Sequence, residues 1–446
     1  MPSSTNTPAD TPSAPAAVPT SHHAAPEAPE AQAPGASGST AGAWGERVYF
    51  PHLDGLRFWA FAAIFAVHAV DSINVGVSST PLYQELVKWA RGGTVGVNFF
   101  FVLSGFLITY LLLAEQRKTG RIDVGAFYIR RALRIWPLYF ACVAVGYLLR
   151  PGSLPGSPLP PLGYYLAFGA NFAVLHGDAL PAGRQWVEGT MLVLWSIGVE
   201  EQFYLAWPLL LGAALPRSLS TQPRPTRGSQ AQGSQAQGSE AGRGGLPMLL
   251  MVGVCALSLA WRIWKRDNWD ALYFHTLGVI GDMALGGLAA WKCYCDPRWP
   301  AFFARLSRRV LVAGYVAALA LVLAQAQWKG VSWFNALERP LLAGAAAFII
   351  LEQCYALNSF FKCGGSKLLS KLGTYTYGLY CLHLFAIIAV QKALAILHLD
   401  RHLWQMLALQ IPLALALSIA LAALSYHFFE TPFLRLKRRF AHVQTT

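Results

Sequence analysis

The chain has 446 residues, of which 54% are hydrophobic and only 13% are charged. Soluble proteins carry about 25% charged residues, so this composition, with its repeated long apolar runs, excludes an ordinary soluble enzyme and predicts a polytopic membrane protein. The formal net charge of +13 is assigned to loop lysines and arginines that follow the positive-inside rule. We therefore expect no nucleic-acid partner.

The seven cysteines predict neither a disulfide framework nor a metal site. Their number is odd, and Cys142, Cys255 and Cys381 lie within apolar runs. Cys293 and Cys295 form a C-x-C pair, which is a weak metal signal when no zinc-ligand spacing accompanies it. We therefore expect no bound metal.

Composition also divides the chain into one membrane domain and polar flanking segments. Residues 1–46 are rich in Ala, Pro, Ser and Thr and cannot bury a core, so we expect a disordered cytoplasmic tail without signal-peptide features. Residues 216–246 contain the repeat GSQAQGSQAQGSE and are expected to form a flexible cytoplasmic linker. The membrane domain is expected to cover 47–440, followed by a short tail at 441–446.

The apolar runs predict an all-α, polytopic membrane helical bundle of about ten transmembrane helices. One shorter run, 162–176, is expected to be re-entrant or interfacial. If it crossed the membrane, the arginines after run 189–215 would lie outside, against the positive-inside rule. The expected spans are 55–75, 95–114, 135–149, 189–215, 247–264, 271–291, 310–326, 338–357, 372–396 and 403–429.

Basic residues in the loops set the expected orientation. The loop after the second span is crowded with lysines and arginines between Arg117 and Arg134. That density predicts a cytoplasmic loop and therefore a cytoplasmic N-terminus, and about ten spans return the C-terminus to the same side. The clearest exception is segment 262–270, which is basic although it is expected to lie outside.

The stretch HLDGLRFWAFAAIFAVHAVD, at 52–71, carries the first candidate site. Arg57 precedes His68 by eleven steps, roughly 16 Å of helix rise and close to three turns, so both side chains share one face. This face offers a permanent charge near one surface and a titratable base at mid-depth. Ionisable groups at membrane depth usually face a polar interior. The alternative is a topology anchor at Arg57 and a hydrogen-bonded packing histidine at His68.

A second candidate site lies in FYIRRALRIWPLY, at 127–139, which places Arg130, Arg131 and Arg134 within one helical turn or so of each other. Three planar guanidinium groups make a good phosphate clamp, because each presents forked donors. A simple topology anchor is the alternative, and the spacing does not exclude it.

A third candidate site lies in LWSIGVEEQFYLAWP, at 194–208. Glu200 and Glu201 are adjacent carboxylates in a helix that must span, and Ser196 and Tyr204 lie one turn before and after Glu200 on the same face. Glu200 is expected near the depth of His68, where a carboxylate can hold the imidazole tautomer and stabilise the imidazolium. The alternative is a structural ion pair with an arginine.

Four more polar residues interrupt or end the apolar runs. Asn98 and Ser104 in the second span can bond across helices or serve plain packing. His383 is a second buried imidazole, or a packing histidine. Glu430, at the cytoplasmic end of the last span, can form a structural salt bridge with Arg57 or the Arg130 group.

Six motifs occur in a fixed order along the chain: LDGLRFWAFAAIFAVHA, GVNFFFVLSGFLIT, FYIRRALRIWPLYF, LWSIGVEEQFYLAWP, LGTYTYGLYCLHLF and SYHFFETPFLRLKRR. Together they resemble the acyltransferase 3 family of bacterial membrane enzymes over about 47–440. The family's arginine–ten residues–histidine motif falls on Arg57 and His68. Its paired-arginine motif falls on Arg131 and Arg134, and its Ser…Glu motif falls on Ser196 and Glu200.

The resemblance implies a multi-pass O-acyltransferase of the bacterial cytoplasmic membrane. It would move an acyl group, expected to be acetyl, from acyl-CoA on the cytoplasmic side to a carbohydrate hydroxyl, such as one on a cell-surface polysaccharide or lipid-linked glycan. His68 is then the general base and Glu200 its partner, although an acyl-histidine relay is an alternative. The residues expected to bind CoA phosphates are Arg57, Arg130, Arg131 and Arg134. The residues expected to support the substrate are Asp54, Asn98, Ser104, Ser196, Tyr204, His383 and Glu430, with Ser196 or Asn98 as a donor to the oxyanion.

The rival class is a transporter or flippase, in which His68 and Glu200 form a proton path through the bundle. It predicts flux without thioester consumption, and it leaves the arginine cluster with no ligand beyond the membrane surface. The sequence determines neither the acceptor nor the oligomeric state.

Overall fold

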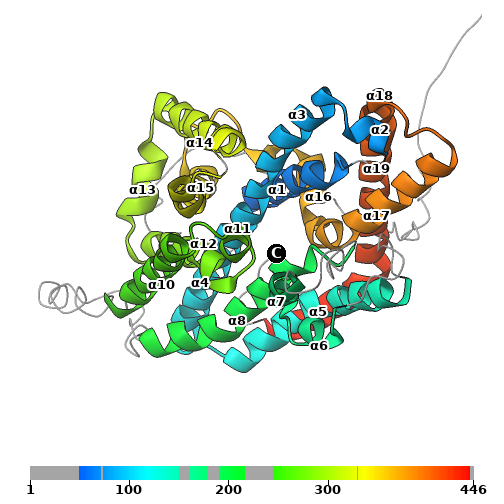
Figure 1. Cartoon of the computed structure of the whole chain (residues 1–446). Coiled ribbons are helices and arrows are strands. Elements are labelled where there is room, and N and C mark those ends of the chain that lie inside the picture. Colours follow the sequence, from blue (N-terminus) through cyan, green and yellow to red (C-terminus); the bar gives the residue numbers. More distant parts are fainter. Residues whose placement is uncertain are drawn as a thin grey trace, which may run out of the picture. The chain divides into compact units, whose positions relative to one another are not determined.

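The computed structural model describes residues 50–71, 74–149, 160–177, 190–215, 245–328 and 330–441. The expected tail at 1–46, nearly all of the linker at 216–246, and the tail after Ala441 lie outside the described residues. Within the described part all regular structure is helical and no strand occurs (Figure 1). This finding confirms the all-α prediction.

Ten helices of 14 residues or more form the bundle in the described part of the chain. They are α1 (Pro51–Ala69), α4 (Val95–Thr119), α5 (Val124–Leu149), α8 (Leu194–Ala214), α10 (Gly245–Trp264), α12 (Thr276–Cys295), α14 (Arg308–Trp328), α15 (Ser332–Tyr355), α17 (Thr376–Ile396) and α19 (Ile411–Leu424). Shorter helices that position the sites are α2 (Val75–Ser78), α3 (Pro81–Ala90), η2 (Arg91–Thr94), α6 (Leu162–Leu166), α7 (Ala170–Gly177), α11 (Trp269–Tyr273), α13 (Arg298–Arg305), α16 (Lys367–Thr374), α20 (Thr431–Lys437) and η7 (Arg438–Phe440).

Among the described residues, eight helical stretches are long and apolar enough to cross a membrane. They contain α4, α5, α10, α12, α14, α15, α17 and α19. The other two expected spans are α1 and α8, with 19 and 21 residues. Both carry candidate site residues within the helix: Arg57 and His68 on α1, and Glu200 on α8. The prediction of a polytopic membrane helical bundle is therefore confirmed, and eight of its about ten expected spans are long and apolar enough to cross a membrane.

The run predicted to be re-entrant or interfacial does not form a spanning helix. It folds as α6 and α7, of five and eight residues, with a turn between them in which Phe168 has φ +55°. A helix of eight residues is about 12 Å long, which is less than half a hydrocarbon core. Asn171 Nδ2 donates to Phe274 O at 3.1 Å, so α7 is tied to the loop before α12. As a result, α5 ends and α8 begins at the same end of the bundle.

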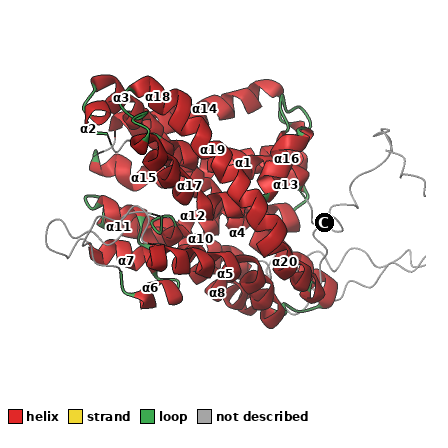
Figure 2. Cartoon of the chain, turned by 90° about the vertical axis from the view of Figure 1, so that its right-hand side faces the viewer, coloured by secondary structure: helices red, strands yellow, loops and turns green. Residues whose placement is uncertain are grey.

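Hydrogen bonds between distant segments define the two ends of the bundle. At one end, Arg130 on α5 pairs with Glu115 at the end of α4; we call this the Arg130 end. At the other, Gln391 on α17 donates to Asp71 O, just after α1; we call this the Asp71 end. In Figure 2, α2, α3, α7 and α11 lie to the left, at the Asp71 end, and α13, α16 and α20 lie to the right, at the Arg130 end.

Arg262 accounts for one of the three basic residues in the segment 262–270, which is basic although it is expected to lie outside. Its side chain is only 2% exposed, at the end of α10. The guanidinium donates to four backbone carbonyls of α15 and of the region from α11 to α12: Ala336, Asn335, Leu272 and Gly278. Arg262 is therefore an internal tie between helices and not a loop charge that would obey the positive-inside rule.

Glycines bring α4 and α12 into backbone contact. A Cβ atom on Gly105 would lie 1.9 Å from Met283 O, and one on Gly286 would lie 2.0 Å from Val102 O. The contact is reciprocal, as expected where small residues let membrane helices approach closely.

We expect Gly286→Ala to separate these helices and lower the free energy of unfolding by about 1–3 kcal/mol or more, as overpacking does. Thermal unfolding of the purified protein, followed by size-exclusion chromatography, measures this effect. The matched control is Gly253→Ala on α10, where a Cβ would meet nothing within 4 Å. Equal melting temperatures for the two variants would show that the close contact does not exist.

Candidate active site

Two histidines from α1 and α17 meet inside the bundle. The ring centroids of His68 and His383 lie 5.4 Å apart, with an interplanar angle of 47°. His383 is fully buried, whereas His68 is half-buried. Sequence reasoning selected both residues, but it did not predict that they are neighbours.

The backbone of α17 fixes the protonation pattern of His383. Its Nδ1 lies 2.8 Å from Tyr380 O and 3.2 Å from Leu379 O. Carbonyl oxygens only accept, so in the neutral ring Nδ1 carries the proton and Nε2 carries the lone pair. Nε2 is buried and has no hydrogen-bond partner among the described residues. A basic nitrogen with a fixed tautomer is thus held beside a second imidazole.

Glu200 forms part of a polar contact between α4 and α8. Tyr204 Oη donates to Glu200 Oε2 at 3.3 Å, and Tyr204 also hydrogen-bonds Ser104 on α4. Three candidate residues that the sequence analysis named separately, Glu200, Tyr204 and Ser104, are therefore brought together. The ring beside His68, however, belongs to His383, and the hydrogen-bond partner of Glu200 is Tyr204.

Tyr380 links the α8 residues to the histidine pair. Its hydroxyl hydrogen-bonds Ser196 Oγ at 2.6 Å, and its ring centroid lies 6.0 Å from that of His383. Ser196 also donates to Val193 O at 3.1 Å, so its hydroxyl is already engaged on two sides. Sequence reasoning missed Tyr380. The available signal was its position three residues before His383, which puts both on one face of a helix.

At the Arg130 end, cations from two distant segments gather. Arg130 donates to Glu115 Oε2 at 2.7 Å and to Phe440 O at 2.8 Å, which ties α5 to α4 and η7. The charges of Arg130, Arg131, Arg134 and Arg438 all act on Lys437. We call these five residues the cationic cluster. Sequence reasoning found the three on α5 but missed Lys437 and Arg438, because only the packing of α20 on α5 joins them.

Arg131 connects the cationic cluster to the α8 contact. Its guanidinium lies 5.5 Å from the ring centroids of both Phe127 and Tyr204. Its Nε is buried without a hydrogen-bond partner among the described residues. Arg134 is exposed, so the cluster combines one stacked and one open guanidinium.

The remaining predicted residues lie around this arrangement. Arg57 forms an ion pair with Asp54 on the same turn of α1. Glu430 accepts a hydrogen bond from Ser425 at 2.9 Å and interacts electrostatically with Arg134, so it lies at the level expected for it. Asn98 lines a cavity at the Asp71 end. No group of three or more His, Cys, Asp or Glu side chains that could hold a metal occurs among the described residues.

The sequence profile of the acyltransferase 3 family, described as an acyltransferase domain, matches residues 50–427. The chain belongs to the acyltransferase 3 family. This membership confirms the resemblance drawn from the six motifs, and it confirms the prediction of an acyltransferase.

Two curated proteins that are similar in sequence to this chain have names that state an activity. Peptidoglycan O-acetyltransferase OatA of Listeria monocytogenes is 26% identical over 408 residues, which cover 86% of this chain and 56% of the relative. O-acetyltransferase OatA of Staphylococcus aureus is 26% identical over 406 residues, which cover 86% and 57%. The chain therefore spans little more than half the length of these relatives. No solved structure matches it significantly.

Proposed function

We propose that this chain is a membrane-bound O-acyltransferase that moves an acetyl group from acetyl-CoA to a hydroxyl of a carbohydrate acceptor. Membership of the acyltransferase 3 family supports acyl transfer. The names of the two OatA relatives support O-acetylation, and that of the Listeria protein supports a cell-wall glycan. The observation that carries the mechanism is the proximity of two rings: the ring centroid of His68 lies 5.4 Å from that of His383, whose Nε2 is buried and has no hydrogen-bond partner among the described residues.

In the proposed reaction, His68 accepts the proton of the acceptor hydroxyl while the hydroxyl oxygen attacks the thioester carbonyl. The new C–O bond forms and the C–S bond breaks. CoA leaves as a thiolate and takes the proton back from the imidazolium. In the substrate complex, the free lone pair of His383 Nε2 would accept the remaining N–H of His68, which would hold the His68 tautomer and stabilise the positive charge. This role was assigned to Glu200 from the sequence, but His383 is the ring in contact.

Glu200 acts in this account as a positioning residue. Its hydrogen bond from Tyr204, and the bond of Tyr204 to Ser104, hold α8 against α4. The guanidinium of Arg131 stacks on the same tyrosine ring. Glu200 therefore connects the proposed donor site at Arg131 with the core of the bundle.

The proposed CoA site is the cationic cluster at the Arg130 end. Arg131 and Arg134 offer guanidinium donors to phosphate. Arg130 uses its donors on Glu115 and Phe440, so we assign it to positioning. Arg57 keeps its assignment to donor binding, with Asp54 orienting it.

We further propose that the Arg130 end faces the cytoplasm of a bacterial cell and that both termini lie there. Its loop is the most basic one, and acetyl-CoA is a cytoplasmic metabolite. The carbohydrate acceptor would then reach His68 from the Asp71 end, within the bilayer or beyond it.

Cysteine reporters test this orientation. In a background with the exposed Cys295 replaced by serine, a cysteine at Arg121 should react with a membrane-impermeant maleimide only after cells are lysed. A cysteine at Ser79, at the end of α2, should react in intact cells. The reverse pattern would overturn the orientation, and labelling of both in intact cells would overturn the odd number of membrane crossings between them.

Acceptor-dependent thiol release tests the reaction itself. Purified protein with acetyl-CoA should release free CoA faster when a carbohydrate acceptor is added. A transporter or flippase would leave the thioester intact, so an absence of thiol release from folded protein would favour the rival class.

A further inference from the structure

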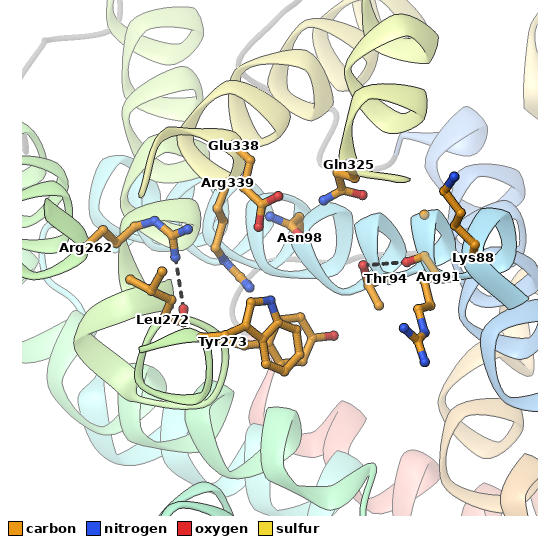
Figure 3. Close-up of a pocket in the computed structure, with 12 residues that line it drawn as sticks. Lys88, Arg91, Thr94, Asn98, Arg262, Leu272, Tyr273, Gln325, Glu338 and Arg339 are labelled. Carbon is orange, nitrogen blue, oxygen red and sulfur yellow. Dashed lines mark hydrogen bonds between the residues drawn. The ribbon is translucent and has the colours of Figure 1, made fainter. Parts of the chain in front are cut away.

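A cavity of about 300 Å³ lies at the Asp71 end, among α3, η2, α4, α10, α11, α14 and α15. Figure 3 shows the side chains that surround it. Among the described lining residues the only carboxylate is Glu338, whereas four are cationic. The cationic ones are Lys88, Arg91, Arg262 and Arg339. Lys88 pairs with Glu85 and Arg339 with Asp282, and the site still keeps a net positive charge when these carboxylates are counted, which favours an anion.

Two buried donors in the lining lack a hydrogen-bond acceptor. Arg339 is 3% exposed, and its Nε donates to Asp282 Oδ2 at 2.8 Å. Its Nη2 has no hydrogen-bond partner among the described residues, and neither has Nδ2 of Asn98, which is 4% exposed. A buried donor without an acceptor destabilises the folded protein. An oxygen-bearing ligand in this cavity would satisfy both donors at once.

Other lining groups fit a sugar attached to that anion. The rings of Trp269 and Tyr273 stack at 4.7 Å with an interplanar angle of 10°. Such flat aromatic surfaces pack against the C–H faces of sugar rings. Gln325 Oε1 is buried without a hydrogen-bond partner among the described residues, so it can accept from a sugar hydroxyl. The cavity thus combines donors for an anion, an acceptor for a hydroxyl and an aromatic surface.

We propose that this cavity binds the carboxylate or phosphate of an anionic carbohydrate acceptor, an inference that rests on the proposed acyl transfer. Asn98 and Arg339 bind the anion, Lys88 and Arg91 attract it at the rim, and Tyr273 packs against the sugar ring. The assignment of Asn98 thereby changes from an oxyanion donor to an acceptor-binding residue.

The position of the cavity suits this role. The ring of Tyr273 lies 5.1 Å from that of Trp195, which directly precedes Ser196 in the chain. Ser196 in turn hydrogen-bonds Tyr380 beside His383. A chain of contacts through Trp195, Ser196 and Tyr380 therefore connects the cavity lining with the histidine pair, and the cavity lies at the end opposite the proposed CoA site.

Equilibrium binding without acetyl-CoA tests the proposal independently of catalysis. The purified full chain is titrated by calorimetry with cellobiose, cellobiuronic acid, cellobiose 1-phosphate and inorganic phosphate. We expect at least one charged disaccharide to bind tenfold or more tightly than both cellobiose and inorganic phosphate. A preference for the uronic acid identifies a glycan carboxylate, and a preference for the phosphate identifies a sugar phosphate such as a lipid-linked glycan carries.

Variants that keep the fold locate the site. Asn98→Asp replaces a hydrogen-bond donor by a second carboxylate in the cavity lining, and it should abolish the preference for charged sugars. Arg91→Gln should weaken the preference for charged sugars several-fold. The control is Lys265→Gln, a basic residue of the same region that stacks on Trp264 and does not line the cavity. Binding of all three disaccharides with equal affinity, or full retention of the preference in Asn98→Asp, would overturn the proposal while leaving acyl transfer to be judged by thiol release.

Discussion

Replacing His68 with glutamine is expected to reduce acetyl transfer by about 10²–10⁴-fold, the range that proton transfer by a positioned side chain supplies. Glutamine keeps approximate size and hydrogen bonding but cannot take up the hydroxyl proton. Binding of CoA should stay within a few-fold of wild type, because the proposed donor site lies at the other end of the shared face of α1. Initial rates and equilibrium CoA binding on the purified variant measure the two effects separately.

Two other histidines serve for comparison: His383 belongs to the proposed site, and His427 is the control outside it. His383→Gln removes the fixed Nε2 lone pair beside His68, so it should also lower the rate strongly without weakening CoA binding. His427→Gln changes a histidine that hydrogen-bonds Tyr375 at 3.1 Å, outside the pair, and should leave the rate within a few-fold of wild type. A folded His68→Gln protein that turned over at the wild-type rate would reduce His68 to a packing role.

Loss of the Arg131 guanidinium is expected to raise the KM for acetyl-CoA at least tenfold. A hydrogen bond to a charged group contributes about 1.5–3 kcal/mol, which corresponds to about 10–150-fold in affinity. Arg131→Gln removes the charge, and Arg131→Lys keeps the charge but loses the forked geometry and the stacking on Tyr204. Donor titrations on both variants should show a raised KM, with much of the rate recovered at high donor concentration.

The control for Arg131 is Arg435→Gln on α20. Arg435 is exposed at the same end of the bundle, so its loss changes the net charge there by the same amount. Its KM should remain close to wild type. If Arg131→Gln and Arg435→Gln had the same KM as wild type, the cationic cluster would not bind CoA.

The helices themselves could be predicted because apolar runs are a local property of the sequence. Ten runs became ten long helices, and the short run at 162–176 became α6 and α7, as its length and the following arginines indicated. The shared face of Ser196, Glu200 and Tyr204 also follows from helical spacing. The partner of Tyr204 across the bundle, Ser104, does not follow from spacing.

Contacts between helices far apart in the chain could not be predicted, since they depend on tertiary packing. The sequence placed Glu200 beside His68 by depth alone, and the structure places His383 there. The sequence predicts how deep a residue lies in the membrane, but it does not predict which helices are neighbours. Neighbouring helices are determined by packing contacts such as that of Gly105 with Met283. Lys437 was likewise missed, because it lies near the arginines of α5 only through tertiary packing.

The buried charges near the Asp71 end show a further limit of sequence reasoning. Loop counting treats every arginine near a span as a solvent-facing charge. Arg262 instead satisfies four carbonyls, and Arg339 pairs with Asp282 inside the bundle. An arginine buried inside the bundle and an arginine in a loop look alike in the sequence, and they can be distinguished only by the packing around them.

The most direct test of the central claim follows the acetyl group itself. Purified wild-type protein and His68→Gln are incubated with acetyl-CoA labelled in the acetyl carbonyl and a carbohydrate acceptor, and the product is treated with mild base. The account predicts base-labile label in the carbohydrate with wild type, one free CoA released for each ester formed, and at most about one hundredth of that label with His68→Gln. Labelled ester formed equally by both proteins, or no ester formed by wild type while the bundle moves protons or glycan across a vesicle membrane, would contradict it.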